Sequence, residues 1–451
     1  MLHELGREAP ELPKNLAVIG AGIAGLSAAW LTSRRHNVTL YEAEARLGGH
    51  ANTVTVETGI GPIDVDTGFI VFNSGNYPNF EALLDYLDVN SIAAEMSFSA
   101  SIGGGDFEYA STFGGLLAQP GNLFSRDYWR MIAEIVKFYR QAEGLIDSPK
   151  LDGVTLGEFL DREGYSQALI DRHILPMSAA IWSCPAETIR SFPMRAFVRF
   201  FSNHRLFRIG APTYWRTVRG GSRTYVEALT TDMRGPFRRR TAVRSVARTA
   251  SGVMVVDADG RREFFDDVIL ATHADVTLAL LSDASDEERR LLGAFRYTDN
   301  RAVLHEDEAL MPKRRRAWAC WNYLDTGALA NGTDLCVTYW MNALQSLDRR
   351  QNLFLTLNPV REPRDSAIKR EFHYTHPVFD QAALDAQHEL WRLQGKRSTW
   401  FAGAYFGYGF HEDGLQSGLA VAEKFGVRRP WTIKNESGRL APEPRLAIEA
   451  A

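Results

Sequence analysis

Four residues near the start of the chain have the types and the spacing to hold a dinucleotide. Gly20, Gly22 and Gly25 form a GxGxxG motif, and Glu42 follows the first of them by twenty-two positions. In such a motif the glycines permit a tight turn, a close backbone approach to a pyrophosphate, and close helix packing. The acid accepts hydrogen bonds from a ribose, and the amides at the helix start favour phosphates. The spacing predicts a dinucleotide site, with a purely structural glycine turn as the alternative.

The residues around this motif predict the elements that must position it. An apolar run at 16–19 indicates a buried strand, 22–35 indicates a helix, and the alternation at 37–41 indicates a second strand. The glycines therefore lie between the strand and the helix of a βαβ unit. Glu42 follows the second strand directly.

Two glycine-rich segments indicate which dinucleotide is bound. After Glu42, the pair Gly48-Gly49 gives a second close backbone approach, and Arg46 supplies a cation near the pyrophosphate. Far downstream, the run that ends at Gly403 is followed by a glycine-rich loop and an expected helix. The amides at the start of that helix would face an anionic ring oxygen. Together these segments favour FAD over NAD.

Later segments predict a helical region and then strands. The helical region covers about 113–203, and within it Thr155 and Glu158 form a capping box that Gly164 ends. One buried helix stripe is expected from the three-to-four spacing of Trp129, Ile132, Ile135, Val136 and Tyr139. Strands are expected at 243–246, 253–256, 263–265, 268–271, 317–323, 335–341 and 353–357.

The order of these motifs resembles that of the flavin-dependent amine oxidase superfamily, which includes monoamine oxidases, phytoene desaturases and protoporphyrinogen oxidase. The motifs in chain order are GxGxxG, the ExxxRxGG run, Asp66-Thr67-Gly68, Arg219 to Ser222, Val243 with the strands leading to Leu270-Ala271-Thr272, and Ala402-Gly403. The resemblance implies an α/β fold, with a Rossmann-type FAD-binding domain and a discontinuous substrate domain of mixed sheet plus helices. The expected FAD domain comprises 1–75, 220–285 and 395–428, the substrate domain comprises 76–219 and 286–394, and 429–451 form an extended tail.

The motifs and the resemblance together predict the residues that contact FAD. They are Gly20, Gly22, Ala24, Gly25, Glu42, Ala43, Arg46, Gly48, Gly49, His50, Gly68, Phe69, Val243, Gly403, Phe410, His411 and Leu415. By the resemblance, Val243 lies on the adenine side, and Phe410 and His411 lie against the flavin ring.

The chain also departs from the family pattern. His50 stands where these enzymes often have arginine, and Ala404 stands where an acidic residue usually follows Ala-Gly. No cysteine lies near the C-terminal motif, so the FAD is expected to be noncovalent. A second GxGxxG is absent, which gives no sign of a separate NAD(P)H domain, and no metal site is expected.

The substrate side offers aromatic residues rather than an acid–base pair. Substrate contacts are predicted at Trp321, Tyr323, Tyr339, Tyr405 and Phe410, with ordinary core packing as the alternative for each. His411 and Tyr408 are the predicted catalytic residues, and a packing role for His411 stays open. Amine oxidases of this superfamily often carry a lysine near the flavin. That lysine is expected to be absent here, because the only lysine between the strand at 268–271 and Leu353 is Lys313, which lies in a basic run that is expected to be exposed. Glu412 and Asp413 leave a cationic substrate open.

Two segments, 317–323 and 403–414, resemble a bacterial subgroup of predicted NAD/FAD-binding proteins that is associated with lipid modification. That resemblance favours a dehydrogenase or desaturase of an apolar, lipid-like or acyl-chain substrate. Three alternatives stay open: an amine oxidase that releases hydrogen peroxide, a flavin-dependent isomerase, and a flavoprotein that binds without turnover. The electron acceptor is unknown, and oxygen is one candidate.

Charge and cysteine content bear on partners and location. The net charge of −4 gives no reason to expect a nucleic-acid partner. The three widely spaced cysteines and the lack of an apolar stretch near the N-terminus favour a cytoplasmic location. Arg195 to Arg208 interleaves large apolar residues with arginines. It is either a buried helix with outward charges or a surface that dips into anionic lipid, which would place the protein at the periphery of the inner membrane.

Overall fold

A five-stranded parallel sheet carries the glycine motif. The computed structural model describes residues 12–146, 148–151, 153–182, 186–207, 215–325 and 336–433. The sheet has the order β10 (Phe237–Arg238), β2 (Asn37–Tyr41), β1 (Asn15–Ile19), β14 (Asp267–Leu270) and β20 (Thr399–Phe401). Its central strands are continuous apolar runs because helices cover both faces. The predicted βαβ opening is present, with α1 (Ile23–Thr32) as its helix.

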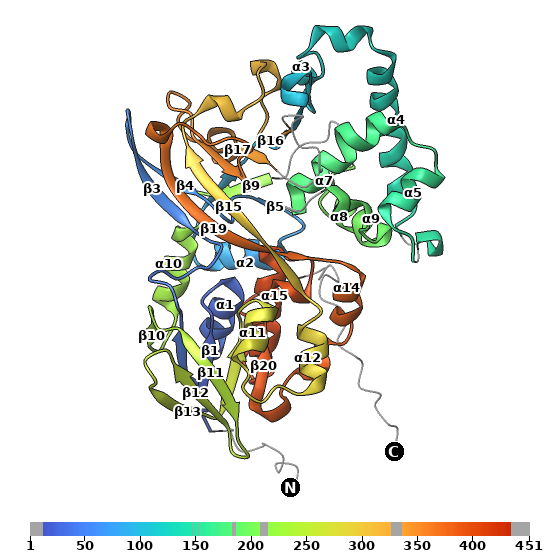
Figure 1. Cartoon of the computed structure of the whole chain (residues 1–451). Coiled ribbons are helices and arrows are strands. Elements are labelled where there is room, and N and C mark those ends of the chain that lie inside the picture. Colours follow the sequence, from blue (N-terminus) through green and yellow to red (C-terminus); the bar gives the residue numbers. More distant parts are fainter. Residues whose placement is uncertain are drawn as a thin grey trace, which may run out of the picture.

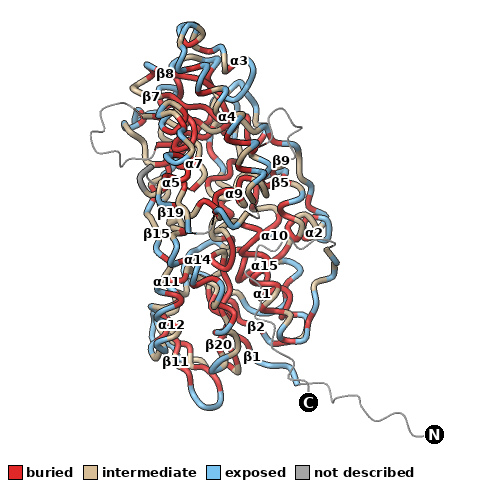
Figure 2. Tube along the Cα trace, turned by 90° about the vertical axis from the view of Figure 1, so that its right-hand side faces the viewer, coloured by how far each residue is buried: buried red, intermediate tan, exposed pale blue. Residues whose placement is uncertain are grey.

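Two helices pack at close range against this sheet. All ten residues of α1 are buried, and Figure 2 shows that buried residues also dominate α15 (His411–Glu423) beside it. A Cβ at Gly418 would come within 2.2 Å of the Ala24 carbonyl oxygen, so the two helices touch backbone to backbone there. A Cβ at Gly25 would lie 1.8 Å from the Gly20 carbonyl oxygen. Only glycine permits this contact of helix with strand.

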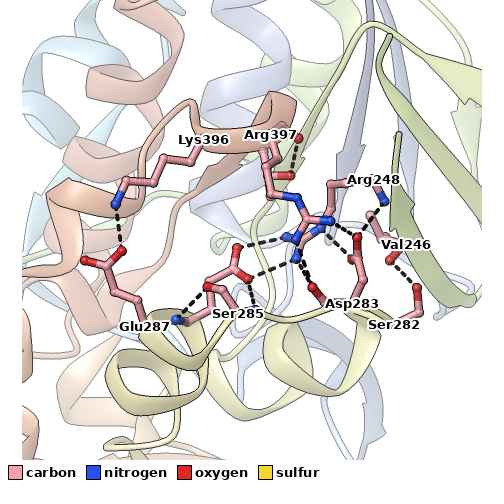
Figure 3. Close-up of polar contacts among 10 residues, drawn as sticks. Val246, Arg248, Ser282, Asp283, Ser285, Glu287, Lys396 and Arg397 are labelled. Carbon is pink, nitrogen blue, oxygen red and sulfur yellow. Dashed lines mark hydrogen bonds and ion pairs between the residues drawn. The ribbon is translucent and has the colours of Figure 1, made fainter. Parts of the chain in front are cut away.

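An antiparallel meander lies beside the parallel sheet and is fastened by buried charges. Its strands are β11 (Val243–Arg248), β12 (Val253–Asp257) and β13 (Arg262–Phe265). The buried Arg248 guanidinium donates two 2.9 Å hydrogen bonds to Glu288 in α12 (Asp286–Leu292) and also pairs with Asp283 (Figure 3). Arg397, just before β20, pairs with the same Asp283. This network joins the meander, α12 and the start of β20.

A seven-stranded mixed sheet forms the second half of the molecule (Figure 1). Its order is β19 (Ile368–Val378), β15 (Arg296–His305), β18 (Phe354–Leu357), β17 (Val337–Trp340), β16 (Trp321–Leu324), β7 (Phe98–Ile102) and β8 (Phe107–Ala110). Only the β16–β7 pair is parallel. Smaller sheets are β3 (Thr53–Thr58) with β4 (Gly61–Asp66), and β5 (Phe72–Asn73), β9 (Trp215–Val218) and β6 (Ser91–Ala93).

Helices cover one side of the mixed sheet, at the upper right of Figure 1. They are α3 (Phe113–Leu116), α4 (Arg126–Glu143), α5 (Leu156–Arg162), α6 (Gln167–Leu169), a π-helical turn (Ile170–Ile174), α7 (Leu175–Trp182), α8 (Ala186–Arg190) and α9 (Met194–Asn203). The remaining helices are α2 (Pro78–Tyr86), α10 (Arg223–Asp232), α11 (Ala274–Leu280), α13 (Met341–Leu344) and α14 (Gln381–Gln387). Within the described residues, none of these helices has both the length and the apolarity to cross a bilayer.

The predicted fold class is confirmed, and most local predictions agree with the structure. The capping box of Thr155 and Glu158 is present, and Gly164 has a φ of +68° after the helix end. The buried stripe on α4 was wrong in part, because Trp129 is 50% exposed and its indole bonds the Leu123 carbonyl. The fully buried positions of α4 are Tyr128, Met131, Phe138, Tyr139 and Ala142.

The domain boundaries and the tail stay predictions. The parallel sheet draws its strands from three separate stretches of the chain, around 15–41, 237–270 and 399–401. Most of the expected tail at 429–451 lies outside the described residues, as do Cys184 and Arg208.

Candidate functional site

A cavity of about 1160 Å³ lies at the carboxyl ends of the parallel strands and continues under the mixed sheet and the helices. The residues just after β1, β2, β14 and β20 all line it: Gly20, Glu42, Ala271 and Gly403. Open α/β sheets bind their ligands at this edge, outside the carboxyl ends of the strands. The predicted dinucleotide motif therefore faces a space large enough to be a ligand site.

The glycines form a cradle that side chains would fill. Gly20 has a φ of +98°, and a Cβ there would come within 2.8 Å of the Ala271 carbonyl oxygen. A Cβ at Gly22 would meet no atom within 4 Å, so it would project into the cavity where a pyrophosphate must approach. A Cβ at Gly49 would lie 3.0 Å from the Gly22 Cα atom, so the two glycine motifs touch. The cradle fits the phosphates of FAD at the N-terminus of α1.

Glu42 is held in place by backbone amides. Its Oε2 accepts a 2.8 Å hydrogen bond from the Ala21 amide, and its Oε1 accepts a 2.9 Å bond from the Glu44 amide. Each carboxylate oxygen has a second lone-pair position, and Glu42 lines the cavity. The carboxylate is thus oriented for ribose hydroxyls. Val243 lines the cavity on the same side, since the neighbouring Thr241 amide bonds the Glu42 carbonyl at 2.9 Å.

Three histidines gather at the wall near the glycine pair. The His50 ring lies 5.9 Å from His273 and 5.7 Å from His376, measured between ring centroids. Burial, with the other histidines, lowers the pKa of His50 well below its usual value, and burial lowers the pKa of His376 to about 4. Burial also lowers the pKa of His273, so all three rings are neutral at neutral pH. Within the described part of the chain, the His50 Nε2 atom is buried without a hydrogen-bond partner, which leaves a polar contact for a bound cofactor.

The cradle, the oriented acid and the partnerless His50 nitrogen together fit FAD. No cysteine lines the cavity among the described residues, and Cys320 and Cys336 are buried elsewhere. The structure therefore offers no thiol for a covalent link in the part of the chain that it describes. The prediction that the FAD is noncovalent stays a prediction.

Most predicted site residues line this one cavity. They are Gly20, Gly22, Ala24, Glu42, Ala43, Gly48, Gly49, His50, Gly68, Phe69, Val243, Trp321, Tyr339, Gly403, Tyr405, Tyr408, Phe410 and His411. Four predicted residues do not line it: Gly25, Arg46, Tyr323 and Leu415.

The four residues that do not line the cavity make other contacts or lie elsewhere in the fold. Arg46 donates from its Nη1 atom to the Gly49 carbonyl at 2.7 Å and the Ala51 carbonyl at 3.2 Å, so its guanidinium braces the glycine turn, and its contact with a phosphate stays a prediction. Gly25 serves the contact between α1 and β1, as described above. Leu415 is fully buried in the core along α15. Tyr323 lies two residues beyond Trp321 on β16, about 7 Å farther along the strand, and is not among the residues that line the cavity.

His411 is the first residue of α15, as predicted, and its ring is tightly enclosed. The imidazole stacks on Phe69 with a centroid distance of 3.8 Å, and its Nε2 pairs with the Tyr225 hydroxyl at 2.7 Å. Burial lowers the pKa of His411 to about 3. A ring with its Nε2 engaged and so low a pKa is a poor proton acceptor, so this geometry favours the packing role.

Glu412 and Asp413 bond backbone amides and are not among the residues that line the cavity. Glu412 accepts hydrogen bonds of 2.9 Å from the Asn79 and Phe80 amides at the start of α2. Asp413 accepts from the Tyr408 amide at 3.1 Å and the Phe410 amide at 2.9 Å. Both carboxylates therefore hold backbone amides, and neither is among the residues that line the cavity, so a cationic substrate stays an untested alternative.

The far half of the cavity is apolar, and sequence reasoning missed most of it. On α4 the residues expected in a buried stripe, Ile132, Ile135 and Val136, face the cavity instead. They are joined by Met96, Phe98, Met177, Ile181, Trp182, Phe200 and Trp215. Periodicity marks such positions as apolar but cannot distinguish a core from a cavity wall. Three side chains carry a full charge among the described wall residues, and these are Glu42, Glu44 and Arg205.

Arg195 to Arg208 is mostly a core helix. Phe197, Phe200 and Phe201 of α9 are at most 2% exposed, whereas Arg205 is exposed. The large apolar side chains of α9 therefore point inward. Membrane contact through this segment stays a prediction, and Arg208 lies outside the described residues.

Comparisons with known proteins agree with this geometry. Residues 23–303 match the family model described as flavin containing amine oxidoreductase. An L-amino-acid oxidase of Notechis scutatus scutatus is 57% identical over 47 residues, which cover 10% of this chain and 9% of that protein. A carotenoid phi-ring synthase of Streptomyces griseus is 27% identical over 273 residues, covering 57% and 52% of the two chains. The chain therefore matches only part of the length of these curated relatives.

Solved structures share the fold over nearly the whole chain. A fatty acid isomerase of P. acnes that produces CLA has a TM-score of 0.65 at 16% identity, covering 92% of this chain and 99% of its own. Cyclohexylamine oxidase of Brevibacterium oxydans has a TM-score of 0.64 at 15% identity, covering 92% and 100%. At such identity the likeness concerns the fold alone.

Proposed function

Because the chain belongs to the flavin containing amine oxidoreductase family, whose members use FAD, we propose that it is an FAD-dependent oxidoreductase that desaturates an apolar, lipid-like substrate. An acyl chain is the substrate class that suits the cavity best. The reaction removes two hydrogens from neighbouring carbons, a hydride that passes to the FAD and a proton that passes to solvent, and leaves a carbon–carbon double bond.

The observation that carries this proposal is the charge of the cavity wall. Beyond the dinucleotide cradle, the described wall has no carboxylate, and Glu412 and Asp413 are engaged with backbone amides. A protonated amine moved into such a space would lose its hydration without gaining a counter-ion. An alkyl chain gains from the same transfer, by about 0.8 kcal/mol for each buried CH₂ group.

The wall residues position the substrate and exclude water. When bound, FAD supplies the hydride acceptor for the reacting carbon. Tyr408 and Phe410 line the wall at the start of α15, where Phe410 stacks on Phe200 at 4.9 Å. Trp321 and Tyr339 meet edge to face at 5.7 Å on the mixed sheet. These aromatic surfaces form a slot for a flat or extended apolar chain.

The test is an anaerobic reduction experiment with the FAD-loaded protein. A methyl-branched or unsaturated acyl lipid should bleach the flavin absorbance, and simple amines should not. Bleaching by an amine, together with none by any lipid, would overturn the proposal in favour of an amine oxidase. Oxygen consumption with candidate amines checks the same alternative independently.

A flavin-dependent isomerase is the second candidate, and the apolar wall favours it as much as a desaturase. The structural neighbour from P. acnes is named a fatty acid isomerase. An isomerase would convert an unsaturated acyl lipid without lasting loss of flavin absorbance. Product analysis by mass therefore separates the two activities, because desaturation lowers the substrate mass by two hydrogens and isomerisation leaves it unchanged.

We also propose a cytoplasmic location with peripheral contact to the inner membrane through Arg195 to Arg208. Because the phenylalanines of α9 point inward, this contact would be electrostatic and would weaken with salt. Co-sedimentation with anionic vesicles should fall in R199E/R205E and persist in the control R261E/R262E, which changes the net charge equally at two exposed residues where β13 begins. Equal binding by both variants would refute a contact at this segment.

A further inference from the structure

Three polar side chains form a chain of hydrogen bonds in the wall of the apolar half of the cavity. Tyr109 on β8 pairs with His173 Nδ1 at 2.5 Å, and Tyr139 on α4 pairs with His173 Nε2 at 2.7 Å. His173 lies in the π-helical turn between α6 and α7. Such turns are rare in proteins, and those that occur are often found at functional sites. All three residues line the cavity.

This array has three polar hydrogens, two O–H and one N–H, but only two hydrogen bonds within it. Burial lowers the pKa of His173 to about 3 and raises the pKa values of both tyrosines, so all three groups are neutral. A neutral imidazole has one N–H and one acceptor nitrogen. Three protons therefore serve two hydrogen bonds, and whichever tyrosine accepts from the imidazole keeps its own O–H free to donate.

The protein offers this spare proton only a weak acceptor. In the described part of the chain, the one further hydrogen-bond partner of either hydroxyl is the Met177 sulfur, 3.5 Å from the Tyr139 oxygen. A thioether is a weak acceptor. A buried donor without a good partner costs about 1–3 kcal/mol, so a ligand oxygen at this point would be stabilised.

We propose that the Tyr109–His173–Tyr139 array donates a hydrogen bond to the carbonyl oxygen of an esterified acyl chain. The inference rests on the proposed function and names its substrate class more closely. A single neutral donor suits a neutral carbonyl oxygen. It cannot repay the desolvation of a free carboxylate, which costs far more than one hydrogen bond returns. Arg205, the one cation on the described wall, follows α9 and is not part of the array.

The array also sets the direction of the chain. Phe98 and Met177 flank His173 and Tyr139, with the Phe98 ring 6.2 Å from the imidazole. Both residues line the cavity, as do Ile132 and Ile135. An acyl chain whose carbonyl meets the array would lie along these apolar side chains, with its methylene groups extending toward the glycine cradle.

The test compares an ester with an alkane of similar length. Methyl decanoate and undecane are titrated into the FAD-loaded protein, and binding is followed by the fluorescence of the wall residues Trp182, Trp215 and Trp321. In the double variant Y109F/Y139F the ester should bind about five-fold more weakly, the size of one neutral hydrogen bond, and undecane should bind unchanged.

Tyr128→Phe is the matched control. Tyr128 is also buried on α4, but it bonds the Leu116 carbonyl and does not line the cavity, so Y128F should bind both probes like the wild type. Unchanged ester binding in Y109F/Y139F, or an equal loss for undecane, overturns this inference alone. Tighter binding of decanoate than of the ester, lost in Y109F/Y139F, overturns the neutral-carbonyl assignment. Failure of both probes to bind the wild type overturns the proposed function and this inference with it.

Discussion

Replacing Glu42 with glutamine should weaken FAD binding without disturbing the fold. The Glu42 carboxylate accepts backbone amides on both oxygens, from Ala21 at 2.8 Å and Glu44 at 2.9 Å. A glutamine can accept only through its oxygen. Its NH₂ group must then either face a backbone N–H or turn toward the cavity and meet the ribose as a donor. Either arrangement loses a charge-assisted hydrogen bond.

The expected cost follows from that loss. A hydrogen bond to a charged group contributes about 1.5–3 kcal/mol, which corresponds to a Kd for FAD raised about ten- to hundredfold. Glu42 stands at the end of β2 and is only partly buried, so the sheet itself should keep its stability. The assay is the quenching of flavin fluorescence when FAD is titrated into apoprotein, with the melting temperature of the apoprotein measured alongside.

Glu44→Gln is the matched control for this experiment. Glu44 also lines the cavity and carries the same charge, but its exposed side chain does not hold the Glu42 turn, which uses only the Glu44 amide. E44Q should therefore bind FAD nearly as the wild type does. A Kd for E42Q within twofold of the wild type, or equal losses in both variants, would refute the assignment of Glu42 to the ribose.

Three further predictions concern stability and cavity shape. Burial lowers the pKa of His305 to about 4, below the ordinary value of 6.5. Between these two values the unfolded chain binds a proton at this histidine and the folded chain does not, so the free energy of unfolding falls as the pH falls from about 6.5 toward 4. In His305→Gln, the free energy of unfolding measured with denaturant should depend less steeply on pH in that window, by at most about 1.4 kcal/mol per pH unit. A slope equal to that of the wild type would contradict the lowered pKa of His305. Arg248→Met leaves the Glu288 carboxylate buried without its ion-pair partner, which should lower the free energy of unfolding measured in urea by about 3–5 kcal/mol. The double variant R248M/E288L should recover part of that free energy. Ile135→Trp should narrow the apolar half of the cavity and weaken binding of a sixteen-carbon ester more than a six-carbon one, while equal effects on both would place Ile135 off the substrate path.

The dinucleotide half of the site could be predicted from sequence because its signals are local. Gly20, Gly22 and Glu42 act through backbone geometry within one βαβ unit, and spacing along the chain sets their spacing in space. Arg46 shows the limit of this reasoning. Its charge suggested a phosphate contact, but spacing along the chain gave no sign that its Nη1 atom also bonds the Gly49 and Ala51 carbonyls.

The substrate half could not be predicted, because its residues meet only through tertiary packing. Ile132 and Ile135 have the periodicity of a core helix, and nothing local reveals that the neighbouring layer is missing. The Tyr109–His173–Tyr139 array joins a strand, a long helix and a π-helical turn. No spacing rule connects those three positions.

By itself, the sequence determined the βαβ opening, the glycine cradle, the capping of α5 and the α/β class, since each depends on backbone conformation or on contacts within a few residues. Only the tertiary structure decided that Glu412 and Asp413 fasten helix ends, that His411 is enclosed by Phe69 and Tyr225, and that the far wall carries no carboxylate among its described residues. The physical reason is that a side chain's task depends on which partner comes within hydrogen-bonding distance. That distance is set by elements hundreds of residues apart in the chain, such as α2 and α15.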